Sequence, residues 1–190
     1  SLITGSEGYV DHFEIVEQNV LLTYRDQQRV ATMKAVPADY VAYRNLASRV
    51  EQGSEILKDG ARYYALLGMN VNYDLNAGLF SETLTPLSVN APRRGKLISK
   101  DRDRAFKREA LPIGGLFRIN IDYDSRYFLA PIEFGRELME YDRECNKIEV
   151  ACAENTDLEL YKQRLQASIG DQYLVSTRMD ENAVIYKANE

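Results

Sequence analysis

The sequence predicts an α+β domain built on mixed β-sheets. Short runs rich in β-branched, leucine and aromatic residues recur along the chain, and amphipathic stretches of helical period lie between them. The chain has 190 residues, of which 45% are hydrophobic and 28% are charged. This mixture is globular and long enough for one domain or two subdomains sharing a core, and it excludes a disordered tail, a collagen-like repeat and a disulfide-dense miniprotein. No apolar run reaches the roughly 18 residues needed to cross a bilayer.

The N-terminal third predicts an antiparallel meander. β-Branched, leucine and aromatic residues at 12–16, 20–24 and 30–36 predict three strands. The polar residues 25–28 predict a hairpin turn between the second and third strands. After this meander, residues 38–50 predict one or two short helices.

The middle third predicts strands around one ambiguous segment. Residues 61–67 predict a strand, and 68–77 fit a strand or a helix, of which we favour a short helix ended at Gly78. Residues 83–89 predict a further strand, and 106–123 predict a long extended run with a bend.

The last third predicts a strand–helix–strand unit. Residues 127–130 predict a strand, followed by an amphipathic helix over 132–141. Residues 147–152 predict a strand, 158–169 a helix and 173–177 another strand, which together favour a right-handed crossover. Residues 179–190 predict a final helix, and the chain resembles a domain cut from a longer protein.

One segment of the chain is strongly basic. The net charge of −5 argues against a general nucleic-acid binder, yet residues 93–108 carry a net +6 against −11 for the rest of the chain. The segment predicts a solvated hairpin or a contact for an anionic partner or lipid headgroups, and nucleic acid is disfavoured because no aromatic residues alternate with the charges. The candidate partner-binding residues are Arg93, Arg94, Lys96, Lys100, Arg102, Arg104, Lys107 and Arg108.

Side chains suited to catalysis or metal binding are scarce. His12 is the only histidine and falls in a predicted strand, where a hydrogen-bonded or solvated side chain is favoured over a catalytic one. Cys145 and Cys152 would lie about 23 Å apart along an extended strand, which predicts two free thiols and no zinc site. The Asp122–Ser125 segment predicts a polar turn rather than half of a calcium loop. No nucleophile elbow, phosphate-binding loop or dinucleotide fingerprint occurs, so we expect no catalytic, cofactor or metal site.

Several short motifs occur in a recognisable order. The first is Gly115-Leu116-Phe117, which precedes the acidic turn Asp122-Tyr123-Asp124. A helix from Pro131 to Leu138 and the strand Ile148-Glu149-Val150 follow. The last two motifs are Gly170 with Tyr173 and Val175, and Asn182 with Tyr186 and Lys187. In this order they resemble the extracytoplasmic, MacB-like core domain of ABC transporter permeases, a family that includes macrolide-exporter, lipoprotein-releasing and FtsX-like permeases. Residues 16–40 resemble the N-terminal half of that domain, with Ala35 where the family usually has glycine.

The resemblance implies a two-part architecture outside the inner membrane. A porter-like βαβ subdomain would comprise residues 1–52 and 140–190, with its N-terminus truncated, and a β-rich inserted subdomain would comprise 53–139. The domain would be inserted between the first two transmembrane helices of the permease, on the periplasmic side. ATP would be bound by a separate ATPase subunit or domain, and this chain would hold no cofactor.

The resemblance also gives the basic segment a candidate partner. In the lipoprotein-releasing branch, a hairpin after a strand ending in Val-Pro recruits a soluble periplasmic chaperone. Here Val89-Asn90-Ala91-Pro92 ends the corresponding strand, but the second proline of that branch is absent. Chaperone binding by residues 93–108 is therefore a hypothesis.

The function expected from these observations is that of a non-catalytic periplasmic domain, which transmits ATP-driven motion of membrane helices to cargo or a partner, in lipoprotein release or efflux. Its partners would be the ABC ATPase subunit and a periplasmic chaperone or envelope protein, without nucleic acid. Two alternatives stay open, namely a cell-envelope signalling or scaffold domain that activates a hydrolase, and an extracytoplasmic enzyme or ligand-binding domain.

Overall fold

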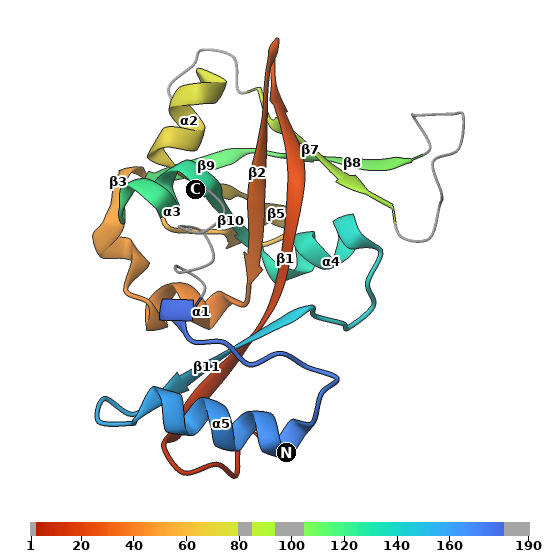
Figure 1. The fold of residues 1–190 in the computed structure, drawn as a ribbon. Coiled ribbons are helices and arrows are strands. Elements are labelled where there is room, and N and C mark those ends of the chain that lie inside the picture. Colours follow the sequence, from red (N-terminus) through yellow and green to blue (C-terminus); the bar gives the residue numbers. More distant parts are fainter. Residues whose placement is uncertain (1–2, 80–84, 94–104, 181–190) are drawn as a thin grey trace, which may run out of the picture. The chain divides into compact units, whose positions relative to one another are not determined.

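The computed structural model describes residues 3–79, 85–93 and 105–180 (Figure 1). Within them, nine strands form one mixed sheet and two more form a short ribbon. The chain divides into two compact units, a smaller one of residues 1–12 and 149–190 and a larger one of residues 13–148. The predicted α+β class is confirmed.

The larger unit begins with a long hairpin. β1 (Tyr9–Tyr24) and β2 (Gln27–Val36) pair antiparallel as far as Tyr24 and Gln27, which confirms the predicted turn. The expected meander is wrong at its start, because residues 12–16 and 20–24 are parts of one strand. The polar residues between them stay in the ladder, where Asn19 is paired with Thr32 and accepts a hydrogen bond from its hydroxyl at 2.8 Å.

The sheet of the described residues has the order β3-β9-β6-β10-β2-β1-β7-β8, and β11 also pairs with β1. β10 runs parallel to β2 and β6 parallel to β9, whereas the other pairs with a determined register are antiparallel. The remaining strands are β3 (Val50–Gly53), β6 (Ala65–Gly68), β7 (Leu87–Pro92), β8 (Phe106–Leu111), β9 (Ile113–Phe117), β10 (Tyr127–Pro131), β11 (Lys147–Cys152), and the ribbon of β4 (Lys58–Asp59) and β5 (Arg62–Tyr63).

Helices of the larger unit contribute to two buried clusters. Successive strand residues point to opposite faces, so Ala35 belongs to one cluster and Val36 to the other. α2 (Met69–Leu75) and α4 (Ile132–Met139) contribute to the cluster with Ala35. α1 (Ala38–Tyr43), the 3₁₀ helix η1 (Leu46–Arg49) and α3 (Ile121–Arg126) contribute to the cluster with Val36. The prediction of one or two short helices over 38–50 is thereby confirmed, with two helices present.

Three predictions in the middle of the chain need correction. The helix favoured over 68–77 is α2, but its left-handed C-terminal residue is Asn76, with φ of 47°, rather than Gly78. Asparagine tolerates this conformation because its short polar side chain can hydrogen-bond locally. The single extended run expected over 106–123 is wrong, since β8 and β9 are separate strands and the run ends before α3. The Asn120 side chain caps α3 by accepting from the Tyr123 amide at 2.9 Å. The strand predicted over 83–89 begins only at Leu87, with residues 83 and 84 outside the described residues.

The smaller unit is built around α5 (Leu158–Ile169), whose N-terminus is capped by Asp157. The strand predicted over 173–177 is wrong. The Gln166 amide instead donates to the carbonyls of Gly170 and Tyr173 and accepts from the Val175 amide, so a side chain takes the place of a neighbouring strand. The predicted crossover therefore does not form. A helix starts at residue 178, and the rest of the segment predicted as helical, 181–190, lies outside the described residues.

The compact units do not correspond to the subdomains that the resemblance implies. Strands from both 1–52 and 53–139 enter the same sheet. The division into compact units does not test the boundaries of those subdomains. The porter-like subdomain of residues 1–52 and 140–190 and the inserted subdomain of residues 53–139 therefore remain a prediction.

Candidate functional site

The candidate site lies on the hairpin formed by β7 and β8. These strands pair over six successive residue pairs, from Leu87 with Leu111 to Pro92 with Phe106, without a register shift. The ladder continues where the Arg93 amide donates to the Ala105 carbonyl at 2.9 Å. Figure 1 shows the two strands running out to one side of the larger unit. The basic segment therefore begins directly after β7, and its last residues lie in β8.

Two of the predicted binding residues help to hold this hairpin in place. The Lys107 ammonium donates to the Glu137 carbonyl of α4 and lies 3.6 Å from the Glu109 carboxylate. Arg108 Nε donates to Asn90 Oδ1 at 2.8 Å, and Asn90 is only 6% exposed. Sequence analysis missed these structural roles because both contacts depend on the folded sheet. Of the other predicted residues, Arg93 follows β7, whereas Arg94, Lys96, Lys100, Arg102 and Arg104 lie outside the described residues.

The side chains considered for catalysis have structural surroundings. His12 is exposed on β1 and its Nδ1 lies 2.8 Å from the Tyr9 hydroxyl, which confirms a hydrogen-bonded strand histidine. Cys145 and Cys152 are free, as predicted, and burial raises the pKa of both thiols. A raised pKa keeps a thiol protonated and weakly nucleophilic at neutral pH.

The acidic segment considered as half of a calcium loop is part of α3. Asp124 is 4% exposed, and its Oδ1 accepts from the Ile119 amide at 2.8 Å. Its carboxylate thus stabilises the start of the helix. Across the described parts of the chain, no cluster of three or more His, Cys, Asp or Glu side chains is placed to hold a metal ion.

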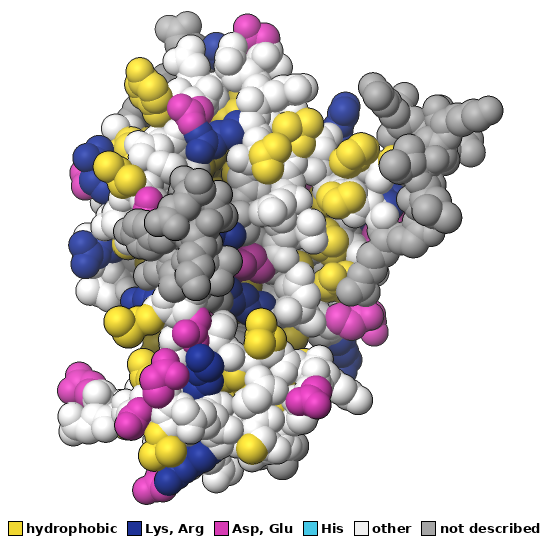
Figure 2. Space-filling view, in the orientation of Figure 1, with side chains coloured by type: hydrophobic (Ala, Val, Ile, Leu, Met, Phe, Trp, Pro, Cys, Tyr) yellow, Lys and Arg dark blue, Asp and Glu magenta, His cyan; other side chains and the backbone are white. Residues whose placement is uncertain are grey.

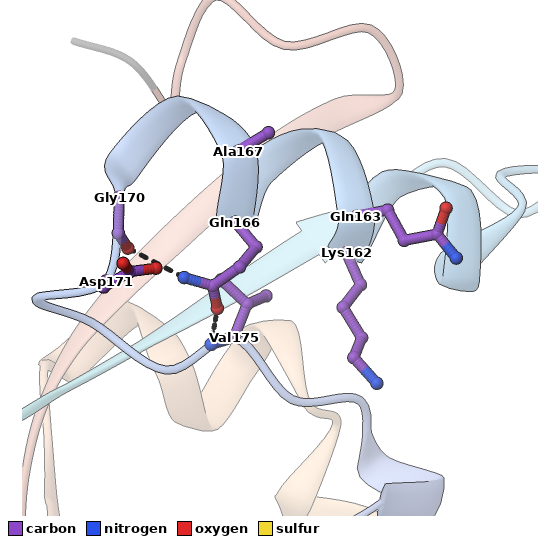
Figure 3. Close-up of a pocket in the computed structure, with 7 residues that line it drawn as sticks. All are labelled: Lys162, Gln163, Gln166, Ala167, Gly170, Asp171 and Val175. Atoms are coloured by element: carbon purple, nitrogen blue, oxygen red, sulfur yellow. Dashed lines mark hydrogen bonds between the residues drawn. The ribbon is translucent and has the colours of Figure 1, made fainter.

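An open cavity of about 430 Å³ lies against α5 (Figure 3). Its lining residues are Lys162, Gln163, Gln166, Ala167, Gly170, Asp171 and Val175. The Gln166 amide is engaged with the following loop, and the Lys162 ammonium lies 2.7 Å from Asp180. Among the described residues that line it there is no histidine, cysteine or hydroxyl side chain. Sequence analysis did not predict this cavity, because it assigned residues 173–177 to a strand.

Neighbouring residues of α5 hold both described ends of the chain. The Tyr161 hydroxyl lies 2.6 Å from the Ser6 hydroxyl. Lys162, the next residue, forms the ion pair with Asp180 at the start of the last helix. Asp180 also accepts from the Thr177 amide, and its own amide donates to the Thr177 hydroxyl, as in a capping box. The hydrogen bonds from Lys162 and Thr177 lower the pKa of the Asp180 carboxyl from 3.8 to about 2.

The contact of Asp180 is expected to be lost in acid. Because its folded-state pKa lies below the ordinary value, Asp180 stabilises the smaller unit above pH 3.8, and this contribution disappears as pH falls towards about 2. Carboxyl-resolved NMR should give a titration midpoint near 2, and Lys162→Met should move the midpoint up. The melting temperatures of the protein and of Asp180→Asn should differ near neutral pH and converge in strong acid. A midpoint at the ordinary value would contradict the contact.

None of the described helices is both long and apolar enough to span a membrane.

Comparisons with known proteins find matches to this chain in structure but not in sequence. No protein-family model and no curated protein sequence matches the chain. The extracellular domain of the noncanonical ABC-type transporter YknZ from Gram-positive bacteria matches with a TM-score of 0.55 and 12% identity, over 92% of this chain and 85% of that one. The periplasmic region of MacB from Actinobacillus actinomycetemcomitans matches with a TM-score of 0.52 and 12% identity, over 87% of this chain and 68% of that one. The chain therefore has the fold of these extracytoplasmic transporter domains, which confirms at the level of the fold the resemblance to MacB-like domains of ABC transporter permeases.

Proposed function

We propose that this chain is the non-catalytic extracytoplasmic domain of an ABC transporter permease. It transmits ATP-driven motion of membrane helices to cargo or to a periplasmic partner, in lipoprotein release or efflux. The observation that carries the proposal is the shared fold, which extends over 92% of this chain and 85% of the YknZ domain. The full-length protein resides in the inner membrane with this domain on the periplasmic side, and ATP binds to a separate ATPase subunit or domain.

The contacts of α5 support an attachment at both ends. A domain inserted between two transmembrane helices must bring its first and last residues back to one membrane. Ser6 is held by Tyr161 and Asp180 by Lys162, so the two ends are fixed to adjacent residues of one helix. Motion of either membrane helix would thus reach α5 directly.

The packing of the larger unit suits the transmission of force. Its strands carry side chains on both faces that belong to buried clusters. Close-packed interiors have low compressibility and transmit strain, whereas a loosely packed domain would absorb it. Such a domain needs a stiff core and an exposed contact surface, and it requires no reactive side chain.

The basic segment is the proposed contact surface. Its excess of positive charge attracts an acidic periplasmic partner, such as a chaperone or envelope protein, and raises the rate of encounter. Lys107 joins the hairpin to α4 and Arg108 joins β8 to β7, and the other basic residues of the segment lie between β7 and β8 in the sequence.

Reconstitution of the full-length permease with its ATPase subunit tests the proposed function. Deletion of residues 3–180 should leave ATP hydrolysis measurable but abolish movement of the cargo, with a labelled lipoprotein and a macrolide as the two cargo probes. Replacement of Arg93, Arg94, Lys96 and Lys100 by serine should leave folding intact and reduce cargo movement, most strongly at low salt. An ATPase-inactive subunit is the control that stops both activities. Unchanged cargo movement after the deletion, or a full-length protein without flanking membrane helices, would refute the proposal.

A further inference from the structure

Among the described strands, none pairs with the outer edge of β8. β8 is the last strand in the sheet order, and β7 is its neighbour. The bond between the Arg93 amide and the Ala105 carbonyl, together with the register, fixes which residues of β8 face β7. In an antiparallel pair this direction alternates, so 107, 109 and 111 face β7. The N–H and C=O groups of Phe106, Arg108 and Ala110 therefore point away from the sheet.

The side chains of the same three residues share one face of the sheet. Those of Phe106, Arg108 and Ala110 are exposed, with Phe106 at 48%. Lys107 and Leu111 lie on the other face, where Lys107 contacts Glu137 of α4 and Leu111 is fully buried. Figure 2 shows hydrophobic side chains at the surface over β7 and β8. Within the described ranges, α4 contacts one face of β8, and no backbone hydrogen bond engages the three outward residues.

β8 has few of the features that usually protect an edge strand from pairing with another chain. Natural sheets protect their edges with short strands, bulges, proline or charge. β3, at the other end of the order, has four residues and a register shift. β8 has six regularly paired residues and no proline, so charge is its main protection.

The positive charge on β8 determines which kind of strand can pair with its outer edge. A second copy of this chain that paired through the same edge would bring its Arg108 beside the Arg108 of the first, and like charges facing each other across strands are destabilising. An acidic strand would gain both backbone hydrogen bonds and electrostatic attraction.

We propose that the outer edge of β8 binds an extended acidic segment of a partner protein, which joins the sheet as a further strand. Alternate residues of the added strand lie beside Phe106, Arg108 and Ala110, so an acidic residue opposite Arg108 with small or apolar neighbours fits this face. The inference depends on the proposed function in one respect, because it requires a partner protein outside the membrane.

Peptide binding to the chain of residues 1–190 tests this proposal. The probe is a labelled, acetylated and amidated heptapeptide with glutamate at its fourth position, valine at the second and sixth and threonine elsewhere, so that the glutamate and the two valines share one face. The matched peptide carries lysine in place of the glutamate. The acidic peptide should bind at low salt and slow the hydrogen exchange of the Phe106, Arg108 and Ala110 amides, whereas the lysine peptide should bind at least about tenfold more weakly.

Ala110→Pro is the decisive variant. It removes an outward N–H and no hydrogen bond to β7, so it should weaken peptide binding at least about tenfold, while Ala110→Val should change it less than about twofold. Arg108→Glu should reverse the preference between the two peptides. If Ala110→Pro does not fold, the test uses instead an acidic peptide that is N-methylated at alternate residues. The methylated N–H groups all lie on one edge of the extended peptide, and that edge should no longer bind to β8.

Three results would overturn the proposal. These are no binding of the acidic peptide at low salt, binding without protection of the three amides, and concentration-dependent protection in the absence of peptide, which would identify a second copy as the occupant. Failure of the proposed transport function is distinguishable, because peptide binding would persist while the reconstituted permease would not need the domain to move cargo.

Discussion

Gly135→Ala should lower the free energy of unfolding of this protein by about 2 kcal/mol, although alanine is the better helix former. A Cβ atom on Gly135 would lie 2.4 Å from the Cβ atom of Ala35 and 3.3 Å from that of Val16. Both neighbours are fully buried in strands, so α4 would have to move away from the sheet. Overpacking of this kind costs about 1–3 kcal/mol or more, against a gain of about 1 kcal/mol in helix propensity. Urea denaturation measures the difference.

A double-mutant cycle isolates the contact between the two positions. Ala35→Gly removes the methyl group that the new side chain would meet, so it should restore much of the stability lost in Gly135→Ala. The coupling energy should exceed about 1 kcal/mol, even though Ala35→Gly alone is destabilising. Equal effects of Gly135→Ala in the presence of alanine and of glycine at position 35 would show that this contact does not determine the helix position.

The same pair shows why sequence reasoning reached only part of the fold. The sequence alone shows Ala35 only as a departure from the usual glycine of the family. In the structure Ala35 lies inside β2, and the glycine that makes room is Gly135, on α4. A contact between residues one hundred positions apart leaves no local pattern in a single sequence.

Elements defined by local signals were predictable. The hairpin turn at Arg25 and the helices α4 and α5 follow from turn residues, apolar spacing and caps, which act over a few residues. The strand expected over 173–177 failed because Gln166, placed by α5, binds that backbone instead. Which partner a backbone group finds depends on tertiary position, and local propensity does not determine it.

The candidate site was predictable in charge but not in geometry. The excess of lysine and arginine over 93–108 is visible in the sequence. That Arg108 is bound to Asn90, and that its backbone faces outward, follows from the register of β8 against β7. A shift by one residue would exchange the inward and outward groups, so this assignment requires the paired strands.

Gly68→Ala should be more damaging still, with a loss of about 3 kcal/mol or more in the free energy of unfolding. Its new Cβ atom would lie 2.3 Å from the carbonyl oxygen of Asp124 and 2.8 Å from the carbonyl carbon and the Cα atom of that residue. These are backbone atoms of α3, which cannot rotate out of the way as a side chain can. The Asp124 carboxylate is bound to the Ile119 amide and Asn120 caps the helix, so displacing α3 would strain both hydrogen bonds.

The backbone conformation itself does not require glycine at this position. Gly68 has φ of −60° and ψ of 141°, which alanine adopts freely, so the expected loss is steric alone. Gly78→Ala is the matched control, because a Cβ atom there meets nothing within 4 Å, and it should change the stability by less than about 0.5 kcal/mol. Urea denaturation of the two variants gives the comparison, and amide chemical shifts in α3 should move only in Gly68→Ala. Equal stability of the two variants would mean that β6 and α3 do not approach each other as closely as the structure shows.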